Sequence, residues 1–368
     1  MGLDKRLMMP DYKNCIANIP NSVVKHFGAE PAGDTLPQLD RLLEEKEYKN
    51  IVLFLLDGMG TFVLEETLSE DGFFRRHMQE SISSVFLATT VAATTSAISG
   101  LQPCEHGWLG WDCYYPCVDK NVTVFLNTVQ GTDEPAADYN IARTVTPYTS
   151  AVDRIRMAGG QAYNNYAFMP PYPGTFERVC ERLKKLCKEP GRKYIYCYHN
   201  EPDQILHQYG RGTAETKQTL RYIESYMEKT VSQLEDTLLI ITADHGHINN
   251  RLAFLKNYPD IEDCLVRTPS LEPRVLNLFV KPGREREFEE RFNAAFGEDF
   301  LLMTAEQALG MKLFGTGREH PAFRTMLGNY LAIAAGDLSI YFTDERWKAM
   351  HGSLTPDEMK IPFIVCRT

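Results

Sequence analysis

Short apolar runs, each followed by polar residues, are the most regular pattern along the chain. Ile51–Gly60 (IVLFLLDGMG) starts with apolar residues and continues into Asp-Gly, and Tyr194–Tyr198 and Leu238–Thr242 are similar apolar runs. Such runs are typical of strands that are buried on both faces of a parallel sheet. Ile361–Cys366 (IPFIVC) predicts another strand, in which Pro362 indicates either a sheet edge or the start of the strand.

Amphipathic helices are predicted between these strands. Before Pro190-Gly191, apolar residues recur at helical spacing: Phe176, Val179, Cys180, Leu183, Leu186 and Cys187. A second helix, from about Thr213, carries Leu220, Ile223, Met227 and Val231 on one side. Because strands and helices alternate, we expect an α/β fold with a doubly wound, mostly parallel sheet flanked by helices.

The stretch 254–340 has a different pattern. Arg274–Val280 predicts a strand, and Glu285–Phe296 predicts a charged helix. We expect 254–340 to form a small inserted α+β unit that acts as a lid or cap, and residues 1–253 and 341–368 to form the core domain.

Composition and charge exclude several classes of partner. The chain has 368 residues, a formal net charge of −10 and a pI of about 5.5, which disfavours binding to nucleic-acid polymers and to anionic membranes. No apolar run approaches the roughly 20 residues that span a bilayer. Nine cysteines, an odd number without regular spacing, favour a reducing cytoplasm. The oligomeric state is left open.

Seven side chains with metal-binding atoms lie where predicted strands and helices begin or end: Asp57, Thr90, Asp203, His207, Asp244, His245 and His351. Asp57 and the Asp244-His245 pair stand at the ends of predicted strands, and Asp203 follows its strand closely. Ligands of doubly wound sheets bind beyond these carboxyl ends. Asp203 and His207 are four residues apart, so a helical turn places both on one face. Oxygen and nitrogen donors in this number suit two divalent metal ions.

Thr90 is the candidate nucleophile. It lies in Leu87–Gly100 (LATTVAATTSAISG), which predicts a loop that enters a helix ending at Gly100. A hydroxyl at a helix N-terminus faces free backbone amides, which favour phosphate. Metal coordination would lower the pKa of this alcohol and make it reactive. The sequence therefore predicts a phosphoryl-transfer hydrolase, with Thr89 as the alternative nucleophile.

Four motifs resemble those of the alkaline phosphatase superfamily, most closely its branch of nucleotide pyrophosphatases and phosphodiesterases. The motifs are the strand-end Asp57, Glu-Pro-Asp-x-x-x-His over Glu201 to His207, Asp-His-Gly over Asp244 to Gly246, and His351-Gly352. Ser99-Gly100 and the following Pro103 to Gly107 align the family's nucleophile with Thr90. The resemblance covers most of the chain apart from the N-terminal stretch and the insert.

The resemblance implies two metal sites, one formed by Asp203, His207 and His351 and the other by Asp57, Thr90, Asp244 and His245. The metal would be zinc, with Mn or Mg as alternatives. The implied activity is a phosphodiesterase or nucleotide pyrophosphatase that takes a small phosphate ester and forms a phosphothreonine intermediate. A phosphomonoesterase, phosphomutase or phosphonate hydrolase on the same scaffold is an alternative, and so is a non-catalytic metal-binding protein.

The residues that would bind the rest of the substrate are less well defined. The family branch usually carries an asparagine three residues after the nucleophile to hold a phosphoryl oxygen, and this chain has Ala93 there. Thr94 or a backbone amide would take its place. Trp108 and Trp111 belong to an aromatic cluster that either binds a substrate base or packs in the core.

Four other polar residues are given structural interpretations. His106 and His247 are expected to be structural, or to support metal ligands rather than bind metal themselves. Arg274 and Lys281 are expected on a solvated face, with contact to a substrate's distal charge as the alternative.

Overall fold

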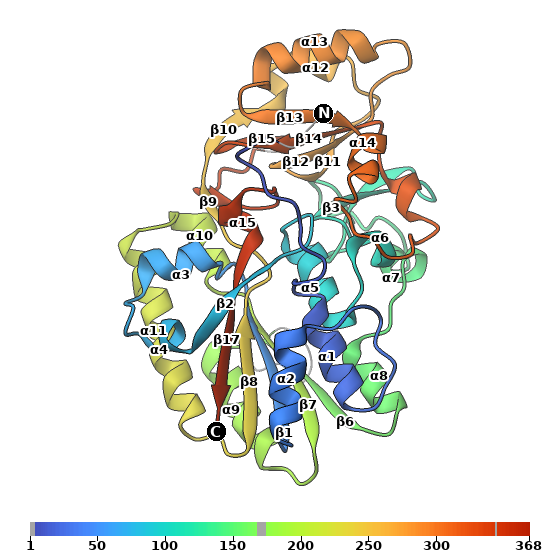
Figure 1. The fold of residues 1–368 in the computed structure, drawn as a ribbon. Helices are drawn as coiled ribbons and strands as arrows, with labels where there is room; N and C mark the ends of the chain where they lie inside the picture. Colours follow the sequence, from blue (N-terminus) through green and yellow to red (C-terminus); the bar gives the residue numbers. More distant parts are fainter. Residues whose placement is uncertain (1–3, 168–173, 343) are drawn as a thin grey trace.

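The computed structural model describes residues 4–167, 174–342 and 344–368, and a six-stranded sheet lies at its centre (Figure 1). The strand order is β2-β17-β8-β1-β7-β6. The strands are β1 (Asn50–Leu56), β2 (Met78–Ser83), β6 (Gln161–Tyr166), β7 (Lys193–His199), β8 (Thr237–Thr242) and β17 (Lys360–Arg367). Strands β6, β7, β1 and β8 are parallel, whereas β17 is antiparallel to both β8 and β2. The predicted α/β fold with a mostly parallel sheet is confirmed.

Helices cover both faces of this sheet (Figure 1). One group consists of α1 (Asn18–His26), α2 (Pro37–Glu45), α5 (Thr90–Ser99) and α8 (Ala151–Met157), and the other of α3 (Thr61–Thr67), α4 (Phe73–His77), α9 (Phe176–Lys188) and α11 (Ala214–Val231). Every residue of β1, β7 and β8 is consequently buried. This two-sided burial explains why these strands are continuous apolar runs rather than alternating ones.

The predicted helix and strand positions agree with the structure, and only one of the two interpretations of Pro362 is wrong. The six apolar residues of α9 are all buried, and Thr175 and Thr213 cap the N-termini of α9 and α11. Pro362 is the third residue of β17 and pairs only with Ser81 of β2, because pairing with β8 starts at Ile364. Pro362 therefore marks the start of a strand, as predicted. The alternative of a sheet edge is wrong, since β17 lies between β2 and β8.

A second sheet of seven strands forms the other lobe of the molecule (Figure 1). Its strands, in spatial order, are β13 (Phe300–Thr304), β14 (Tyr330–Ala334), β12 (Val275–Leu278), β11 (Ser270–Glu272), β3 (Asp112–Tyr115), β4 (Lys120–Thr123) and β5 (Thr128–Val129). All neighbouring pairs are antiparallel. The predicted insert 254–340 supplies four of these strands and the stretch 112–129 supplies three. The division into a core and an insert at 253/254 and 340/341 stays a prediction.

Short elements connect the two lobes and cover the second sheet. The helices are α6 (Pro103–His106), α7 (Ile141–Val145), α10 (Asp203–Tyr209), α12 (Pro259–Glu262), α13 (Glu285–Phe296), α14 (Ala305–Gly310) and α15 (Pro356–Met359), with 3₁₀ turns at Leu255–Asn257 and Phe323–Met326. Two further strand pairs are β9 (Ile248–Asn249) with β16 (Ala349–Met350) and β10 (Arg251–Phe254) with β15 (Leu338–Tyr341). Helix α13 packs three phenylalanines in one cluster with residues of β12 and β14.

Arg274 ties the second sheet to the C-terminal part of the chain. It is fully buried, and its Nε and Nη2 donate to the Glu358 carboxylate over 2.6 and 2.8 Å. Glu358 also accepts hydrogen bonds from Ser353 N and Thr355 Oγ1, in the turn that follows His351. The predicted solvated face is therefore wrong for Arg274, because its partner lies 84 residues away. Lys281 is exposed, as predicted.

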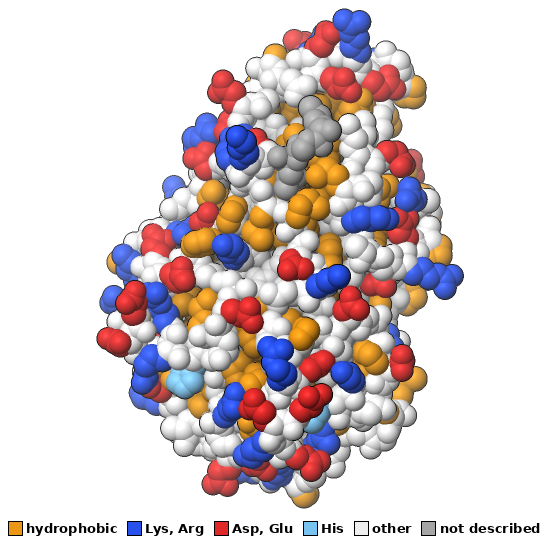
Figure 2. All heavy atoms as spheres, viewed as in Figure 1, with side chains coloured by type: hydrophobic (Ala, Val, Ile, Leu, Met, Phe, Trp, Pro, Cys, Tyr) orange, Lys and Arg blue, Asp and Glu red, His pale blue; other side chains and the backbone are white. Residues whose placement is uncertain are grey.

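The surface carries mixed charges, with Lys and Arg interspersed among Asp and Glu over the face shown in Figure 2. Among the described residues, no helix combines the length and the apolar character that crossing a bilayer requires. The nine cysteines are free thiols, and only Cys117 is exposed. The cytoplasmic location stays a prediction.

Candidate metal centre

The central strands bring distant segments to one edge of the sheet. Asp57 follows β1, Asp203 follows β7 as the first residue of α10, and Asp244 follows β8. The loops are also bonded to one another, since Asp203 N donates to Asp57 O and Gly58 N donates to Asp244 Oδ1. Thr90 is the first residue of α5, and His351 directly follows β16. All seven predicted ligands therefore belong to segments that end or begin at this edge.

The first group consists of Asp57, Thr90, Asp244 and His245. His245 Nε2 lies 3.3 Å from Thr90 Oγ1, 3.4 Å from Asp57 Oδ1 and 3.6 Å from Asp244 Oδ2. Both aspartates are buried, and Asp57 Oδ1 and Asp244 Oδ2 accept no hydrogen bond from the described residues. Buried carboxylate oxygens without a donor are costly, and a divalent cation would satisfy both.

The electrostatics of this group fit a cation as well. Burial, and next the negative charge of Asp244, raise the pKa of Asp57 well above its ordinary value. Burial also raises the pKa of Asp244. Two carboxylates so close together in a buried site cannot both ionise without a positive counter-charge. The side chains present therefore fit a metal ion.

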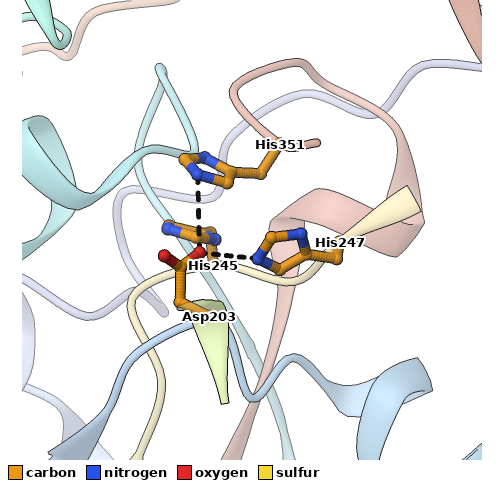
Figure 3. Close-up of side chains that lie close together, drawn as sticks. All are labelled: Asp203, His245, His247 and His351. Atoms are coloured by element: carbon orange, nitrogen blue, oxygen red, sulfur yellow. Dashed lines mark hydrogen bonds and ion pairs between the residues drawn. The ribbon is translucent and has the colours of Figure 1, made fainter. Parts of the chain in front are cut away.

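The second group surrounds the carboxylate of Asp203. His207 Nε2 lies 3.3 Å from Asp203 Oδ1, and His351 Nε2 lies 3.6 Å from the same oxygen. Figure 3 shows His351, His245 and His247 around this carboxylate. The rings of His245 and His351 are stacked with centroids 3.6 Å apart, so the two groups adjoin each other.

The second ring nitrogen distinguishes the predicted ligand histidines from His247. Nδ1 donates to a backbone carbonyl in each of the three: His207 to Ala349 O at 2.8 Å, His351 to Ala88 O at 3.2 Å and His245 to Gly246 O at 3.1 Å. This bond fixes the tautomer in which Nε2 carries a lone pair directed into the site, as in most metal-binding histidines.

His247 has the opposite arrangement. Its Nε2 donates to Asp203 Oδ1 over 2.7 Å, and its buried Nδ1 has no partner among the described residues. Asp203, His245, His247 and His351 are close enough to share one ion by distance alone. The direction of the His247 hydrogen bond instead favours a role in holding Asp203, in agreement with the sequence-based interpretation.

Thr89 and Thr90 are in different environments. The Thr89 hydroxyl donates to Glu272 Oε1 over 2.5 Å, whereas Thr90 Oγ1 faces His245. Glu272 is 4% exposed and belongs to β11, and its Oε1 also accepts from Trp111 N. Burial raises the pKa of Glu272 to about 8. The geometry therefore favours Thr90 over Thr89 as the nucleophile.

The three predicted substrate-binding residues differ in position. A cavity of about 700 Å³ opens over Thr90, and Trp111, 42% exposed, lies in its wall. Trp108 is buried, donates from Nε1 to Thr146 O, and packs against Tyr148 outside the cavity lining. Thr94 Oγ1 donates to Thr90 O at 2.6 Å and likewise lies outside the lining.

The cavity also contains residues that the sequence did not indicate. Asp112 of β3 and Glu272 of β11 line it from the second sheet, and Glu345 and Trp347 line it from the segment before β16. Burial, with a contribution from the charge of Glu345, raises the pKa of Asp112 to about 6. The one sequence signal that could have indicated them is a carboxylate within a short strand of the second lobe, as for Asp112 in β3 and Glu272 in β11.

Comparison with known proteins agrees with this geometry. The sequence pattern of the family described as type I phosphodiesterase / nucleotide pyrophosphatase matches residues 51–298. The chain belongs to this family. The predicted resemblance to the phosphodiesterase branch of the alkaline phosphatase superfamily is thus confirmed. No curated protein matches the chain in sequence.

Solved structures similar to this phosphodiesterase-family chain share its fold. Murine ectonucleotide pyrophosphatase/phosphodiesterase 5, an inactive variant in complex with AMP, has a TM-score of 0.64 and 16% identity, covering 87% of this chain and 88% of its own. The human protein has a TM-score of 0.63 and 19% identity, and the match covers 86% of this chain and 87% of the human chain. Phosphonoacetate hydrolase from Sinorhizobium meliloti 1021, with phosphonoacetate, has a TM-score of 0.64 and 14% identity, with 87% and 90% covered.

Proposed function

We propose that this protein is a two-metal hydrolase of phosphate esters that acts on phosphodiesters or nucleotide pyrophosphates through a phosphothreonine intermediate on Thr90. The observation that carries the proposal is the position of Thr90 Oγ1, 3.3 Å from His245 Nε2 and in one group with two buried, unpaired carboxylate oxygens. Membership of the phosphodiesterase family supports phosphate ester hydrolysis.

The residues that would hold the ions follow from the two groups. Asp57, Asp244 and His245, together with Thr90, would bind one divalent ion, and Asp203, His207 and His351 would bind the other. We favour zinc because histidine nitrogens and carboxylates are both present, with Mn or Mg as alternatives. Bound ions would lower the pKa of the Thr90 hydroxyl and balance the charge on the phosphoryl oxygens.

The chain's own residues then have defined tasks. Thr90 Oγ1 loses its proton to solvent and attacks phosphorus, and the bond from phosphorus to the leaving oxygen breaks as the new bond forms. The leaving oxygen departs as an anion or takes a proton from solvent. A water molecule then cleaves the phosphothreonine, which restores the hydroxyl and releases the phosphorylated product. Thr90 is the first residue of α5, so the free backbone amides of this helix N-terminus would face a bound phosphate. Glu272 keeps Thr89 out of this reaction by accepting its hydroxyl proton in a hydrogen bond.

The similar structures support two substrate classes. The murine protein was solved with AMP as a variant in which alanine replaces a threonine and which is described as inactive. This favours an essential threonine and a nucleotide-type substrate. The bacterial phosphonoacetate hydrolase, at an equal TM-score of 0.64, keeps phosphonate hydrolysis as the second candidate function.

Two treatments test the mechanism. Chelation with EDTA should abolish hydrolysis of bis-p-nitrophenyl phosphate, and added zinc should restore it. Thr90→Ala should lose turnover and the initial burst of p-nitrophenol, whereas Thr89→Ala, the matched control, should keep the burst. Full activity of Thr90→Ala, or after EDTA treatment, would overturn the mechanism.

A substrate panel then separates the candidate functions. Faster hydrolysis of bis-p-nitrophenyl phosphate than of p-nitrophenyl phosphate indicates a diesterase, and the reverse indicates a monoesterase. Release of phosphate from phosphonoacetate indicates a phosphonate hydrolase. Stoichiometric zinc binding without hydrolysis of any of these substrates indicates a non-catalytic metal-binding protein.

A further inference from the structure

The cavity over Thr90 has a strong bias in charge. Among the described residues that line it, five carboxylates lie beyond the proposed metal ligands, and no lysine or arginine is present. The five are Asp112, Asp133, Glu272, Asp344 and Glu345. Asp344 is paired with Lys256, and the Glu272 carboxyl, whose pKa is raised to about 8, is largely protonated at neutral pH. The negative charge of the wall therefore rests on Asp112, Asp133 and Glu345, and it repels additional phosphate groups and attracts positive charge.

Asp112 is one of two buried carboxyls in the cavity wall that lack a cationic partner. It is 8% exposed, and its two oxygens accept hydrogen bonds from Thr123 Oγ1 at 2.6 Å and Gln130 Nε2 at 3.2 Å, both neutral donors. Glu345 is near enough for its charge to act on Asp112. Elsewhere in the chain, the buried Glu358 is paired with Arg274. A buried carboxylate without a positive partner in the folded chain can gain one from a ligand.

A second buried carboxyl in the cavity wall has an unused acceptor. Glu272 is 4% exposed, and its Oε1 accepts from Thr89 Oγ1 and Trp111 N. Its Oε2 accepts no hydrogen bond from the described residues. Glu272 thus offers a ligand an oxygen beside the residue that precedes Thr90.

Two tryptophans lie in the same wall. Trp111 and Trp347 are 42% and 39% exposed. The Trp347 ring lies 5.4 Å from the ring of His207, a proposed metal ligand, and Trp111 is bonded through Glu272 to the residue before the nucleophile. Indole rings attract cations and accommodate methyl groups. Aromatic rings and carboxylates together are the usual surroundings of an alkylammonium group.

We propose that this cavity selects phosphate esters that carry a positively charged ammonium group, which binds among Asp112, Glu345, Trp111 and Trp347. The proposal rests on the proposed function and narrows its substrate class from diesters and nucleotide pyrophosphates to diesters with an amino or quaternary ammonium substituent. Nucleotide pyrophosphates fit less well, because their second phosphate would face these carboxylates.

A pair of substrates that differ only in charge tests the selection. p-Nitrophenyl phosphorylcholine and p-nitrophenyl 3,3-dimethylbutyl phosphate have nearly the same shape, since a carbon replaces the charged nitrogen in the second, and both release p-nitrophenol. We expect kcat/KM of the zinc-loaded enzyme to be at least tenfold higher for the choline ester. Equal values, or a preference for the neutral ester, would overturn the proposal.

Variants locate the selection in the cavity. Asp112→Asn removes the charge and keeps a side-chain oxygen that can accept the hydrogen bond from Thr123. Glu345 is exposed, so Glu345→Gln should fold normally. Each should reduce the ratio of the two kcat/KM values at least threefold. Glu134→Gln, an exposed residue outside the cavity lining, is the control and should keep the ratio. An unchanged ratio in both cavity variants contradicts the proposal.

A binding measurement separates this proposal from the proposed function. Tetramethylammonium chloride should change the tryptophan fluorescence of Thr90→Ala in a saturable way, while sodium chloride and 3,3-dimethylbutanol should not, and Glu345→Gln should weaken the effect. Saturable binding, when the zinc-loaded parent protein hydrolyses neither ester, would support the cation site and reject the proposed function. Hydrolysis of both esters at equal rates without this binding would reject the cation site alone.

Discussion

His247 donates a hydrogen bond from Nε2 to Oδ1 of Asp203 across 2.7 Å, and this bond joins the segments that follow β8 and β7, the two strands on either side of β1. Gly58 leaves the space that this contact needs, because a Cβ at Gly58 would lie 2.9 Å from both Asp203 Cα and His247 Nε2. Asp203 is the carboxylate to which His207 and His351 also turn. The direction of this hydrogen bond therefore favours a role for His247 in orienting a proposed metal ligand over a role as a ligand itself.

The first prediction concerns metal affinity. His247→Ala removes the donor to Asp203 and should weaken zinc binding by about 10- to 100-fold, the range found for residues that orient metal ligands. His247→Gln keeps an N–H donor and should lose less. Competition with a chromogenic chelator measures both, and His26→Ala, distant in sequence and partly buried, is the control. A loss as large in the Gln variant as in the Ala variant would show that His247 binds the metal directly.

The second prediction concerns the glycine of the Asp-His-Gly motif. A Cβ at Gly246 would overlap with Asp357 O, and a Cβ at Gly60 would overlap with Gly246 Cα, so two backbones meet here. Gly246→Ala should lower the free energy of unfolding by about 3 kcal/mol or more, because backbone atoms have to move. Urea unfolding measures this change. Gly310→Ala, where a Cβ meets nothing within 4 Å, should be neutral or slightly stabilising.

The third prediction concerns the buried pair of Arg274 and Glu358. Arg274→Met leaves Glu358 charged and without its cation, which should cost about 3–5 kcal/mol of unfolding free energy. The turn that carries His351 should also loosen, since Glu358 holds Ser353 and Thr355. Arg286→Met, which breaks an exposed pair with Glu290, is the control and should cost less than about 1 kcal/mol. Chemical unfolding measures the free energy of unfolding of both variants. A similar loss in the two would contradict the prediction, because it would show that burial of the pair does not matter.

The fourth prediction concerns acid stability. Burial lowers the pKa of His106 to about 3, and its ring bonds to Ser96 Oγ and Trp108 N in the neutral form. Between about pH 3 and 6.5 the unfolded chain therefore binds a proton that the folded chain does not, so the unfolding free energy falls as the pH falls. His106 should contribute about 2 kcal/mol to the loss between pH 7 and 5.

His106→Gln tests this contribution. The variant should be less sensitive to acid than the parent in urea unfolding at pH 7, 6 and 5, even if it is less stable at pH 7. Part of the slope should remain, because burial also lowers the pKa of His199, to about 4. An identical slope in parent and variant would contradict the assignment.

Sequence patterns predicted the part of the site that depends on local order. Asp57 and Asp244 were expected at one edge because parallel strands end there, and the run of small residues before Gly100 predicted the helix start at Thr90. The choice of Thr90 over Thr89 came from the family resemblance. These inferences need only the position of a residue relative to its own strand or helix. The same reasoning gave the buried face of α9.

The residues that were missed depend on contacts between distant segments. Arg274 looked like a surface residue because its partner Glu358 follows 84 residues later. The contact of Glu272 with Thr89 spans 183 residues. The supporting role of His247 was predicted, but its partner Asp203, 44 residues away, was not. The strands β3, β4 and β5 are too short to stand out from the sequence. Periodicity cannot supply such pairings, because it describes only the neighbourhood of each residue.

The interleaved order of the second sheet limits how this lobe can change. Strand β3 pairs with β11 through Asp112 and Leu271, so a cut that removed 254–340 would leave β3 with an open edge and Glu358 without Arg274. Residues 254–340 consequently cannot be deleted, or transferred to another protein, without disrupting the second sheet. Exchanging individual side chains in the cavity wall leaves this pairing intact, and is therefore the safer way to engineer a new substrate preference.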